Sequence, residues 1–557
     1  MKSKNLISIL TICFFIISDL QSQNWQWAQS LGGNNSDTKI NCLSKYQYNE
    51  ILIAGSFAAA NLSLGNFTVN GSGQEDGFVA ITNTNGSYSW LAKIGGSGDD
   101  KITKAVSDPN GNIYVAGNFS SLSLTVGNIT FYNTGSSDAF LVKFNADKSF
   151  AWARQIATAF KDEISGLAVD NAANVYIAGH SKENMVNNEE KVFIMKISAA
   201  NSLLWEKNIT TSGQILSTSL QTDATQNIYV SGCLFGTADF GNSIILNSGI
   251  EKQHAFIVKY SLTGSCLNGI LSSNQQNINA LAIGSNSIYS CGESPDYLMG
   301  WGWPLASSKI YVAKYNNNLV QQWEKNSGGL KPGQSFDIPF DIAIDQSENV
   351  YVCGYFFSDT LNFAAQNHYN LFHINYFYPQ IFVFKYNSNG SEISAKTMGG
   401  TLWDQANSIL VYGEDKYILG GNFESALCSF GSYTVQNLST LDSIYVHLKP
   451  KRFGRKTLAF LANYDVPSAI DNPDIDLQQS VIYPNPANHQ LFIRQNFLKQ
   501  TNVKLSIYSS DMQLIKRLEL KKQNEDLSFD ISDLKSGIYF VLLENSSDKN
   551  YIKLIKK

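Results

Sequence analysis

A short apolar segment recurs seven times along the chain, and every copy ends in a glycine. Ile113-Tyr-Val-Ala-Gly117 is representative, and the seven glycines are Gly55, Gly117, Gly179, Gly232, Gly292, Gly354 and Gly421. Successive glycines are 62, 62, 53, 60, 62 and 67 residues apart. The segment is β-branched and aromatic and is bounded by turn residues, so it predicts a strand. The regular spacing predicts repeated structural units.

A second apolar segment follows each copy, as in Ala139-Phe-Leu-Val-Lys143, and the seventh unit supplies Ile444-Tyr-Val-His447. Two further strands complete a unit. One precedes the glycine segment, as at Ile102–Val106, and the other carries a tryptophan in several units, such as Trp152. Four strands per unit, repeated radially, predict an all-β chain with a seven-bladed β-propeller over residues 23–449.

The first strand, Trp25–Leu31, precedes the first complete unit, and the seventh unit lacks an obvious tryptophan strand after Ile444–Leu448. We therefore expect the first strand to complete the last blade, which removes open sheet edges. In the competing arrangement, Thr457–Ala462 fills that place.

The pattern changes after the repeats. Residues 450–477 are rich in Pro and Asp and have neither helical nor strand periodicity, which predicts a linker. Residues 478–557 contain closely spaced alternating segments, such as Val503–Tyr508 and Ile538–Leu543, which predict a small β-sandwich.

The N-terminus predicts a signal peptide over residues 1–22. Lys2 and Lys4 precede a short apolar core, Leu6–Ile17, and Ser22 offers a small residue at a cleavage point. About a dozen apolar residues are too few to span a bilayer, so we expect no transmembrane segment in the mature chain. The net charge of −5 argues against a nucleic-acid-binding protein.

Two stretches resemble known families. The pattern Asp108–Gly117, preceded by Gly95-Gly96-Ser-Gly-Asp99, resembles the secreted bacterial β-propeller repeat family over roughly residues 24–449. That family implies the fold and no single activity. The match is looser in units five and seven.

The end of the chain resembles the C-terminal sorting domain of type IX secretion substrates. The resemblance rests on three motifs that occur in the family's order: Tyr483-Pro484-Asn485-Pro486, Asp533–Tyr539 with Gly537 and Tyr539, and the Lys553, Lys556 and Lys557 ending. It implies the type IX secretion machinery as a partner. It also implies passage through the periplasm and across the outer membrane, with the protein attached to the cell surface or released.

No catalytic motif stands out, so we expect a protein that is not an enzyme and that uses no cofactor and no metal. The cysteines form no CxxC pair, and Cys291 and Cys353 are expected to be buried free thiols. Acidic residues recur before the innermost strands: Asp37, Asp99, Asp100, Asp162, Glu163, Asp337 and Asp404. They could surround the channel for a cation or for acid–base chemistry, but recurrence in several units favours turn capping.

Two aromatic-rich insertions follow the glycine segments of units five and six and should emerge as neighbours at one rim. Their candidate ligand-binding residues are Trp301, Trp303, Tyr369, Phe372, Tyr376 and Phe377. Such side chains could stack on sugars or be buried by a protein partner, and they could equally pack their own loops onto the blades.

The leading hypothesis is an exported, non-catalytic binding or scaffold module for a glycan or protein ligand. The alternatives are a polysaccharide lyase or hydrolase, which would need charged residues from several blades at the channel, and a structural surface or adhesion component. The fold alone does not choose among them.

Overall fold

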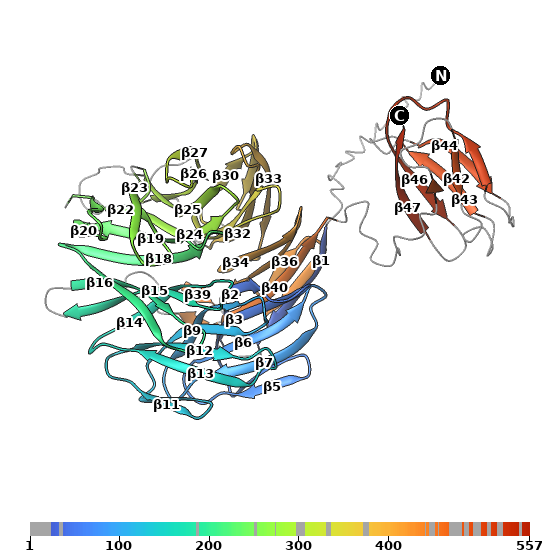
Figure 1. Ribbon diagram of the computed structural model, residues 1–557. Coiled ribbons are helices and arrows are strands. Elements are labelled where there is room, and N and C mark those ends of the chain that lie inside the picture. Colours follow the sequence, from blue (N-terminus) through green and yellow to red (C-terminus); the bar gives the residue numbers. More distant parts are fainter. Residues whose placement is uncertain are drawn as a thin grey trace, which may run out of the picture. The chain divides into compact units, whose positions relative to one another are not determined.

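The computed structural model describes residues 24–556 except 33–36, 185–188, 250–252, 273, 297–306, 330–335, 371–377, 440–441, 445–451, 455, 467–481, 484–489, 494–502, 509–513, 521–526 and 545–548. Every regular element among them is a β-strand (Figure 1). The chain divides into two compact units, Met1–Asp465 and Val466–Lys557. Within the described residues, no helix has the length and apolar character needed to cross a bilayer. The predicted signal peptide lies outside them.

The first unit is a seven-bladed propeller in which each blade is a four-stranded antiparallel sheet, counted here from the innermost strand outwards. Blade one contains β2 (Asp37–Lys45), β3 (Glu50–Ala58), β6 (Asp76–Asn83) and β7 (Tyr88–Ile94). Blade two contains β8 (Asp100–Ser107), β9 (Ile113–Phe119), β12 (Asp138–Phe144) and β13 (Phe150–Ile156). Blade three contains β14 (Asp162–Val169), β15 (Val175–Asn184), β16 (Glu189–Ile197) and β17 (Leu203–Thr210).

The remaining blades follow the same plan. Blade four contains β18 (Gln214–Thr222), β19 (Ile228–Phe235), β22 (His254–Tyr260) and β23 (Cys266–Leu271). Blade five contains β24 (Asn277–Ile283), β25 (Ser287–Asp296), β26 (Ser307–Asn316) and β27 (Gln321–Gly329). Blade six contains β28 (Ile338–Ile344), β29 (Val350–Phe356), β32 (Gln380–Tyr386) and β33 (Glu392–Met398). Blade seven contains β34 (Asp404–Gly413), β35 (Lys416–Phe423), β40 (Leu458–Asp465) and β1 (Trp25–Leu31).

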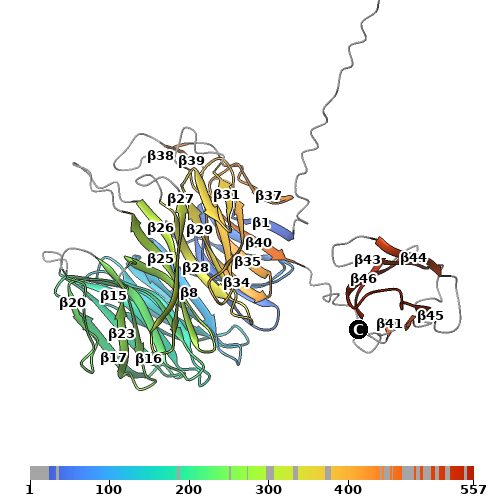
Figure 2. The ribbon, with the colours of Figure 1, turned by 90° about the horizontal axis from the view of Figure 1, so that it is seen from above.

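The ring closes as expected: the N-terminal strand β1 is the outermost strand of blade seven, beside β40 (Figures 1 and 2). The third strand of that blade corrects the sequence analysis. It is Leu458–Asp465 rather than the Ile444 segment, because Leu458–Asp465 pairs with β35 on one side and with β1 on the other, and every residue from Leu458 to Tyr464 is buried. Asp442–Ile444 (β38) instead pairs with Arg452–Gly454 (β39). The propeller therefore extends through Asp465, into the range assigned to a linker.

The recurring glycine has a steric cause. In each blade it lies opposite a β-bulge in the innermost strand, as where Gly117 pairs with Ile102 just before the register shift. A Cβ on Gly117 would lie 2.0 Å from the carbonyl oxygen of Lys101, and the corresponding distance is 1.8–2.2 Å in the other six blades. Only glycine permits this approach of two backbones.

The tryptophans of the outer strands join neighbouring blades. The indole N–H of Trp152 in blade two donates to the carbonyl of Ala199 in blade three at 3.0 Å. Trp205 and Trp323 make the same bond to Leu262 and Ser388 of the next blades. Through these bonds each tryptophan satisfies its polar atom while its ring packs between blades.

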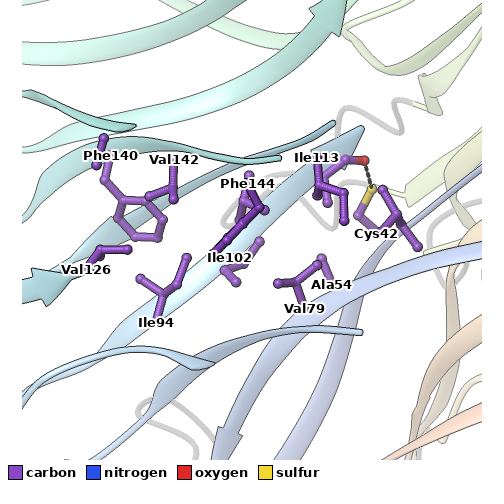
Figure 3. Close-up of a cluster of buried hydrophobic side chains, with 14 of the residues drawn as sticks. Cys42, Ala54, Val79, Ile94, Ile102, Ile113, Val126, Phe140, Val142 and Phe144 are labelled. Carbon is purple, nitrogen blue, oxygen red and sulfur yellow. Dashed lines mark hydrogen bonds between the residues drawn. The ribbon is translucent and has the colours of Figure 1, made fainter. Parts of the chain in front are cut away.

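Apolar side chains from adjacent sheets interdigitate between the blades, as Figure 3 shows for blades one and two. Cys42, Ala54, Val79 and Ile94 come from blade one, and Ile102, Ile113, Val126, Phe140, Val142 and Phe144 come from blade two. All but Val126, Phe144 and Cys42 are at most 1% exposed. The core is thus a set of layers around the ring rather than one central cluster.

Within the described residues, five blades carry a small hairpin between their second and third strands, which the sequence analysis did not predict. The hairpins are β4–β5 (Asn61–Leu64, Phe67–Asn70), β10–β11 (Ser123–Val126, Ile129–Tyr132), β20–β21 (Thr237–Asp239, Ile245–Asn247), β30–β31 (Thr360–Phe363, Gln366–Tyr369) and β36–β37 (Leu427–Phe430, Tyr433–Gln436). In blade six the hairpin pairs with β27 of blade five, through Asn362 and Leu361.

The second unit contains two antiparallel sheets. One consists of β41 (Ile482–Tyr483), β42 (Gln490–Ile493) and β45 (Leu527–Asp530), and the other of β44 (Leu514–Leu520), β43 (Val503–Tyr508), β46 (Gly537–Glu544) and β47 (Lys549–Lys556). Leu491 in the first sheet and Leu505, Ile507 and Val541 in the second are fully buried. This arrangement confirms the small β-sandwich.

Candidate functional site: the mouth cluster

The innermost strands of neighbouring blades contact one another around the ring, and the bulge residues connect them. Asn41 donates to the carbonyl of Ile102 in blade two at 2.8 Å, and Asn279 donates to Pro339 of blade six at 2.7 Å. The equivalent residues Thr103, Thr218 and Asn407 also donate to the next blade's carbonyl, and Ser165 bonds the hydroxyl of Ser217. Six blades therefore place a short polar side chain at this position.

Blade six departs from this pattern, because its bulge residue is Phe340. A phenyl ring has no donor for the next blade. The connection to blade seven is made by Asp341, whose Oδ2 accepts from the Ser408 hydroxyl at 2.7 Å and from the Ile409 amide at 3.0 Å. The ring of inter-blade bonds thus continues while an aromatic side chain occupies the bulge.

Phe340 belongs to a group of aromatic rings at the start of the innermost strands. Its ring centroid lies 5.5 Å from that of Tyr355, which lies 5.3 Å from Phe357 and 5.5 Å from Trp403. Phe357 and Trp403 are 5.1 Å apart. Phe340 and Trp403 are half-buried, so both keep some surface accessible to solvent.

Side-chain amides extend from both ends of this aromatic group. On blade seven, Trp403 Nε1 donates to Gln405 Oε1 at 2.7 Å, and Gln405 Nε2 donates to Asn407 Oδ1 at 2.8 Å. On blade five, Asn277 Nδ2 donates to Asn279 Oδ1 at 2.6 Å. These bonds hold the amides in fixed orientations between the aromatic rings and the bulges.

A carboxyl group completes the blade-five side. Glu293 is the strand partner of Asn277, and its Oε1 accepts from Asn279 Nδ2 at 3.5 Å. Burial raises the pKa of Glu293. Burial also raises the pKa of Tyr355, and the nearby charge of Glu293 adds to that rise. We call this set the mouth cluster: Asn277, Asn279, Glu293, Phe340, Tyr355, Phe357, Trp403, Gln405 and Asn407.

The recurrent acidic residues have mainly structural roles. Asp100 accepts from the amides of Gly96, Ser120 and Ser121, and Asp404 accepts from those of Gly400 and Ser425. Asp108 accepts from the amides of Asn110 and Asn112 and from the Tyr114 hydroxyl. These contacts agree with turn capping, the structural alternative favoured by the sequence.

Glu163 on blade three differs from these capping residues. Its carboxylate contacts Lys161 Nζ at 2.7 Å and His180 Nε2 at 3.0 Å. The hydrogen bond from His180, the largest single cause, and the contact with Lys161 lower the pKa of Glu163 to about 2, against the opposing effect of burial. Among the described residues, no three His, Cys, Asp or Glu side chains are grouped so that they could hold a metal ion.

The predicted ligand-binding residues lie almost entirely outside the described residues: Trp301, Trp303, Phe372, Tyr376 and Phe377. Tyr369 is described, at the end of β31, and is 60% exposed. The sequence analysis missed the mouth cluster. Its signal was present, since Phe340 and Tyr355 occupy positions where other repeats carry small, polar or charged residues.

The six described cysteines are buried and form no disulfide, which agrees with the buried thiols expected at Cys291 and Cys353. In the second unit, Pro484, Asn485, Pro486 and Lys557 lie outside the described residues. The structure brings the other sorting motifs together: Gly537 on β46 is the strand partner of Lys556 on β47, and Lys553 pairs with Phe540. Tyr539 is buried, and its hydroxyl donates to the carbonyl of Lys535 at 2.9 Å.

Each of the two units contains a segment that matches a known protein family. Residues 481–557 match the secretion system C-terminal sorting domain, and residues 151–184 match the beta-propeller repeat. The chain is a β-propeller protein exported by type IX secretion. The sorting domain directs this exported propeller protein to the cell surface or the medium, and the secretion machinery is therefore a partner.

Individual relatives of the exported propeller protein are distant. The uncharacterized WD repeat-containing protein L264 of Acanthamoeba polyphaga mimivirus is 27% identical over 229 residues, which cover 33% of this chain and 16% of that protein. The Neurospora crassa Pan2 WD40 domain has a TM-score of 0.37 at 8% identity, covering 77% of this chain and 90% of its own. A Dyadobacter fermentans protein of unknown function has a TM-score of 0.35 at 9% identity, covering 67% and 97%.

Proposed function

We propose that the exported propeller is a non-catalytic binding module that holds a glycan at the mouth cluster. One observation carries this proposal: aromatic rings and oriented side-chain amides gather on three adjacent blades, and two of the rings, Phe340 and Tyr355, stand at positions where the other repeats carry small, polar or charged residues. A residue that recurs at the same position of most blades is explained by its role in maintaining the fold. A residue that departs from the repeat without a structural gain is a candidate for function.

The chemistry of the mouth cluster suits a sugar. A pyranose ring has an apolar C–H face and hydroxyl groups around its edge. Phe340 and Trp403 offer ring surface, while Gln405, Asn279 and Glu293 offer hydrogen-bond donors and acceptors at its margin. Sites of this kind combine apolar walls with a few placed polar groups.

Binding without catalysis is supported by the burial of the acidic side chains and by the contacts that they already make within the fold. Asp100 and Asp404 are buried and engaged by backbone amides, and Glu163 is engaged by Lys161 and His180. Groups held in this way are poor candidates for proton transfer to a ligand.

A polysaccharide-cleaving enzyme is the second candidate, because the half-buried Glu293 lies within the mouth cluster and burial raises its pKa. A raised pKa is what a general acid requires, so Glu293 is the residue that would carry this reaction.

The test mixes the full chain with insoluble and soluble polysaccharides and records both loss of protein from solution and release of sugar fragments. Depletion without fragments is expected. Fragments that disappear in a Glu293→Gln variant would establish the enzyme instead, and absence of both depletion and fragments would overturn glycan binding.

The matched variants for this test use the repeat itself. Phe340→Asn installs the residue that blades one, five and seven carry at the bulge, so the fold has a precedent for it. We expect Phe340→Asn to abolish depletion, while Asn41→Ala, at the same position in blade one, leaves it unchanged.

A further inference from the structure

The carboxyl group of Glu293, on blade five of the mouth cluster, has no positively charged partner among the described residues. Its one hydrogen bond comes from Asn279 Nδ2 and is 3.5 Å long. Burial raises the pKa of Glu293 and the Asn279 amide opposes that rise, while no Lys, Arg or His side chain of the described residues contributes. Glu293 is therefore a half-buried acid that the fold leaves without a counter-charge.

Other carboxyl groups at this end of the blades are engaged by Lys or His side chains, by backbone amides or by hydroxyl groups. Examples are Glu75, Glu163, Asp337 and Asp341. Partial removal of a carboxylate from water costs free energy unless a partner compensates for it. Glu293 thus bears a cost with little structural return, which makes it a candidate for ligand binding.

Glu293 borders the aromatic rings of blade six. Asn279 Nδ2, which contacts Glu293, also donates to the carbonyl of Pro339 at 2.7 Å, and Pro339 immediately precedes Phe340. The Glu293 charge adds to the effect of burial in raising the pKa of Tyr355, whose ring centroid lies 5.5 Å from that of Phe340. The carboxyl group and the rings therefore belong to one part of the mouth cluster.

Both the carboxyl group and the outer ring can be reached from solvent. Glu293 and Phe340 are each half-buried. Glu293 Oε2 accepts no hydrogen bond within the described part of the chain, and it is not one of the fully buried polar atoms. A ligand group at the mouth can therefore contact this oxygen and the Phe340 ring.

We propose that Glu293, with the neighbouring rings of Phe340 and Tyr355, forms a subsite for an ammonium group, so that the ligand is a glycan with unacetylated amino sugars. This inference rests on the proposed glycan binding and specifies its ligand class. An ammonium group is attracted to aromatic rings and forms charge-assisted hydrogen bonds with a carboxylate. The ligand thus supplies the counter-charge that Glu293 lacks, whereas a uronate or a sulfate would be repelled.

The test compares polymers that differ in charge, by affinity electrophoresis of the full chain. Glycol chitosan has free amino groups, and glycol chitin has the same backbone with those groups acetylated. Polygalacturonate and the neutral polymers xylan, mannan and β-1,3-glucan complete the set. We expect glycol chitosan to retard the protein at a concentration at least about tenfold lower than any other polymer.

Three variants separate the subsite from overall charge and from the aromatic rings. Glu293→Gln keeps the shape of the side chain and should bring glycol chitosan to within about twofold of glycol chitin. Glu163→Gln removes the same charge from a carboxylate that Lys161 and His180 already engage, so it should leave the ratio unchanged. Phe340→Asn should abolish retardation by both polymers.

Each result has a distinct consequence. Equal or tighter binding of a neutral or acidic polymer would overturn the ammonium subsite and leave glycan binding standing. A preference for glycol chitosan that Glu293→Gln leaves unchanged, or that Glu163→Gln lowers equally, would also overturn the subsite. Retardation by no polymer would remove glycan binding and the subsite together.

Discussion

The bulge ring, meaning the seven pairs of repeat glycine and innermost-strand bulge, and the mouth cluster both lie on or beside the two inner strands of the blades, yet they follow opposite rules. At the bulges, all seven blades bring a glycine against a backbone carbonyl at 1.8–2.2 Å from its missing Cβ. In the mouth cluster, blade five carries Glu293 and blade six carries Phe340 and Tyr355, which have no counterpart of the same type in the other repeats. The first region shows what the fold requires of every blade, and the second shows what it leaves free.

The strongest challenge to this contrast is a substitution at the bulge ring. Gly117→Ala places a Cβ 2.0 Å from the Lys101 carbonyl oxygen, and neither backbone can move without breaking the sheet. We expect a loss of about 3 kcal/mol in the free energy of unfolding, measured by denaturant titration. Gly413→Ala is the control, since its nearest contact is the flexible Lys416 side chain at 3.2 Å. Equal effects of the two variants would contradict the steric account.

A second effect concerns the capping carboxyl groups. Burial raises the pKa of Asp404 to about 7, although the Ser425 hydroxyl and backbone amides lower it. The folded protein then binds a proton that the unfolded chain releases near pH 4, so this group's stabilisation is complete below about pH 4 and is lost as the pH rises through 7.

We therefore expect the full chain to be more stable at pH 5 than at pH 8, with Asp404 contributing about 2 kcal/mol of the difference. Thermal unfolding of the protein and of Asp404→Asn at both pH values measures it. A pH difference that Asp404→Asn leaves intact would show that another buried acid, such as Asp337, is responsible.

A smaller effect is expected at the hydrogen bonds that tryptophans of the outer strands donate to the next blade. Trp152→Phe keeps an aromatic ring between blades two and three but removes the 3.0 Å bond to the Ala199 carbonyl. The loss should be about 1 kcal/mol, visible as a lower unfolding midpoint without a change in the denaturant m-value. An unchanged midpoint would mean that packing alone joins these blades.

The smallest effect on stability is expected from Phe340→Asn. The bulge regains the side chain used in blades one, five and seven, so the unfolding free energy should change by no more than about 0.5 kcal/mol. Loss of glycan binding at unchanged stability would separate the mouth cluster from the fold. A large destabilisation would instead show that Phe340 is part of the core.

The seven blades could be predicted from the sequence because each repeat contains the same types of residue that its strands and turns need. The glycine, the tyrosine-bearing strand and the capping aspartate of blade two all lie within Asp108–Gly117. The third strand of blade seven was predicted wrongly for a related reason. Ile444-Tyr-Val matches the local pattern as well as Leu458–Asp465 does, and it is the pairing of Leu458–Asp465 with both β35 and β1 that identifies the strand.

The candidate site was not predicted because its members are distant in sequence. Glu293, Phe340 and Trp403 come from three blades, and each looks like an isolated variation in its own repeat. The aromatic insertions around Trp301 and Tyr376 drew attention because their residues are consecutive. Tyr369, the one described member of that set, lies on a hairpin joined to blade five, which the sequence pattern did not predict.

The sequence by itself determined the strand repeat, the seven-fold count and the export domain, because each depends on residues close together or on motifs read in order. Tertiary structure alone decided which strands fill and close blade seven, why the glycine is required and which side chains meet in the mouth cluster. Those outcomes depend on how closely two backbones approach each other and on contacts between blades. Neither produces a regular spacing of residues that can be recognised in the sequence.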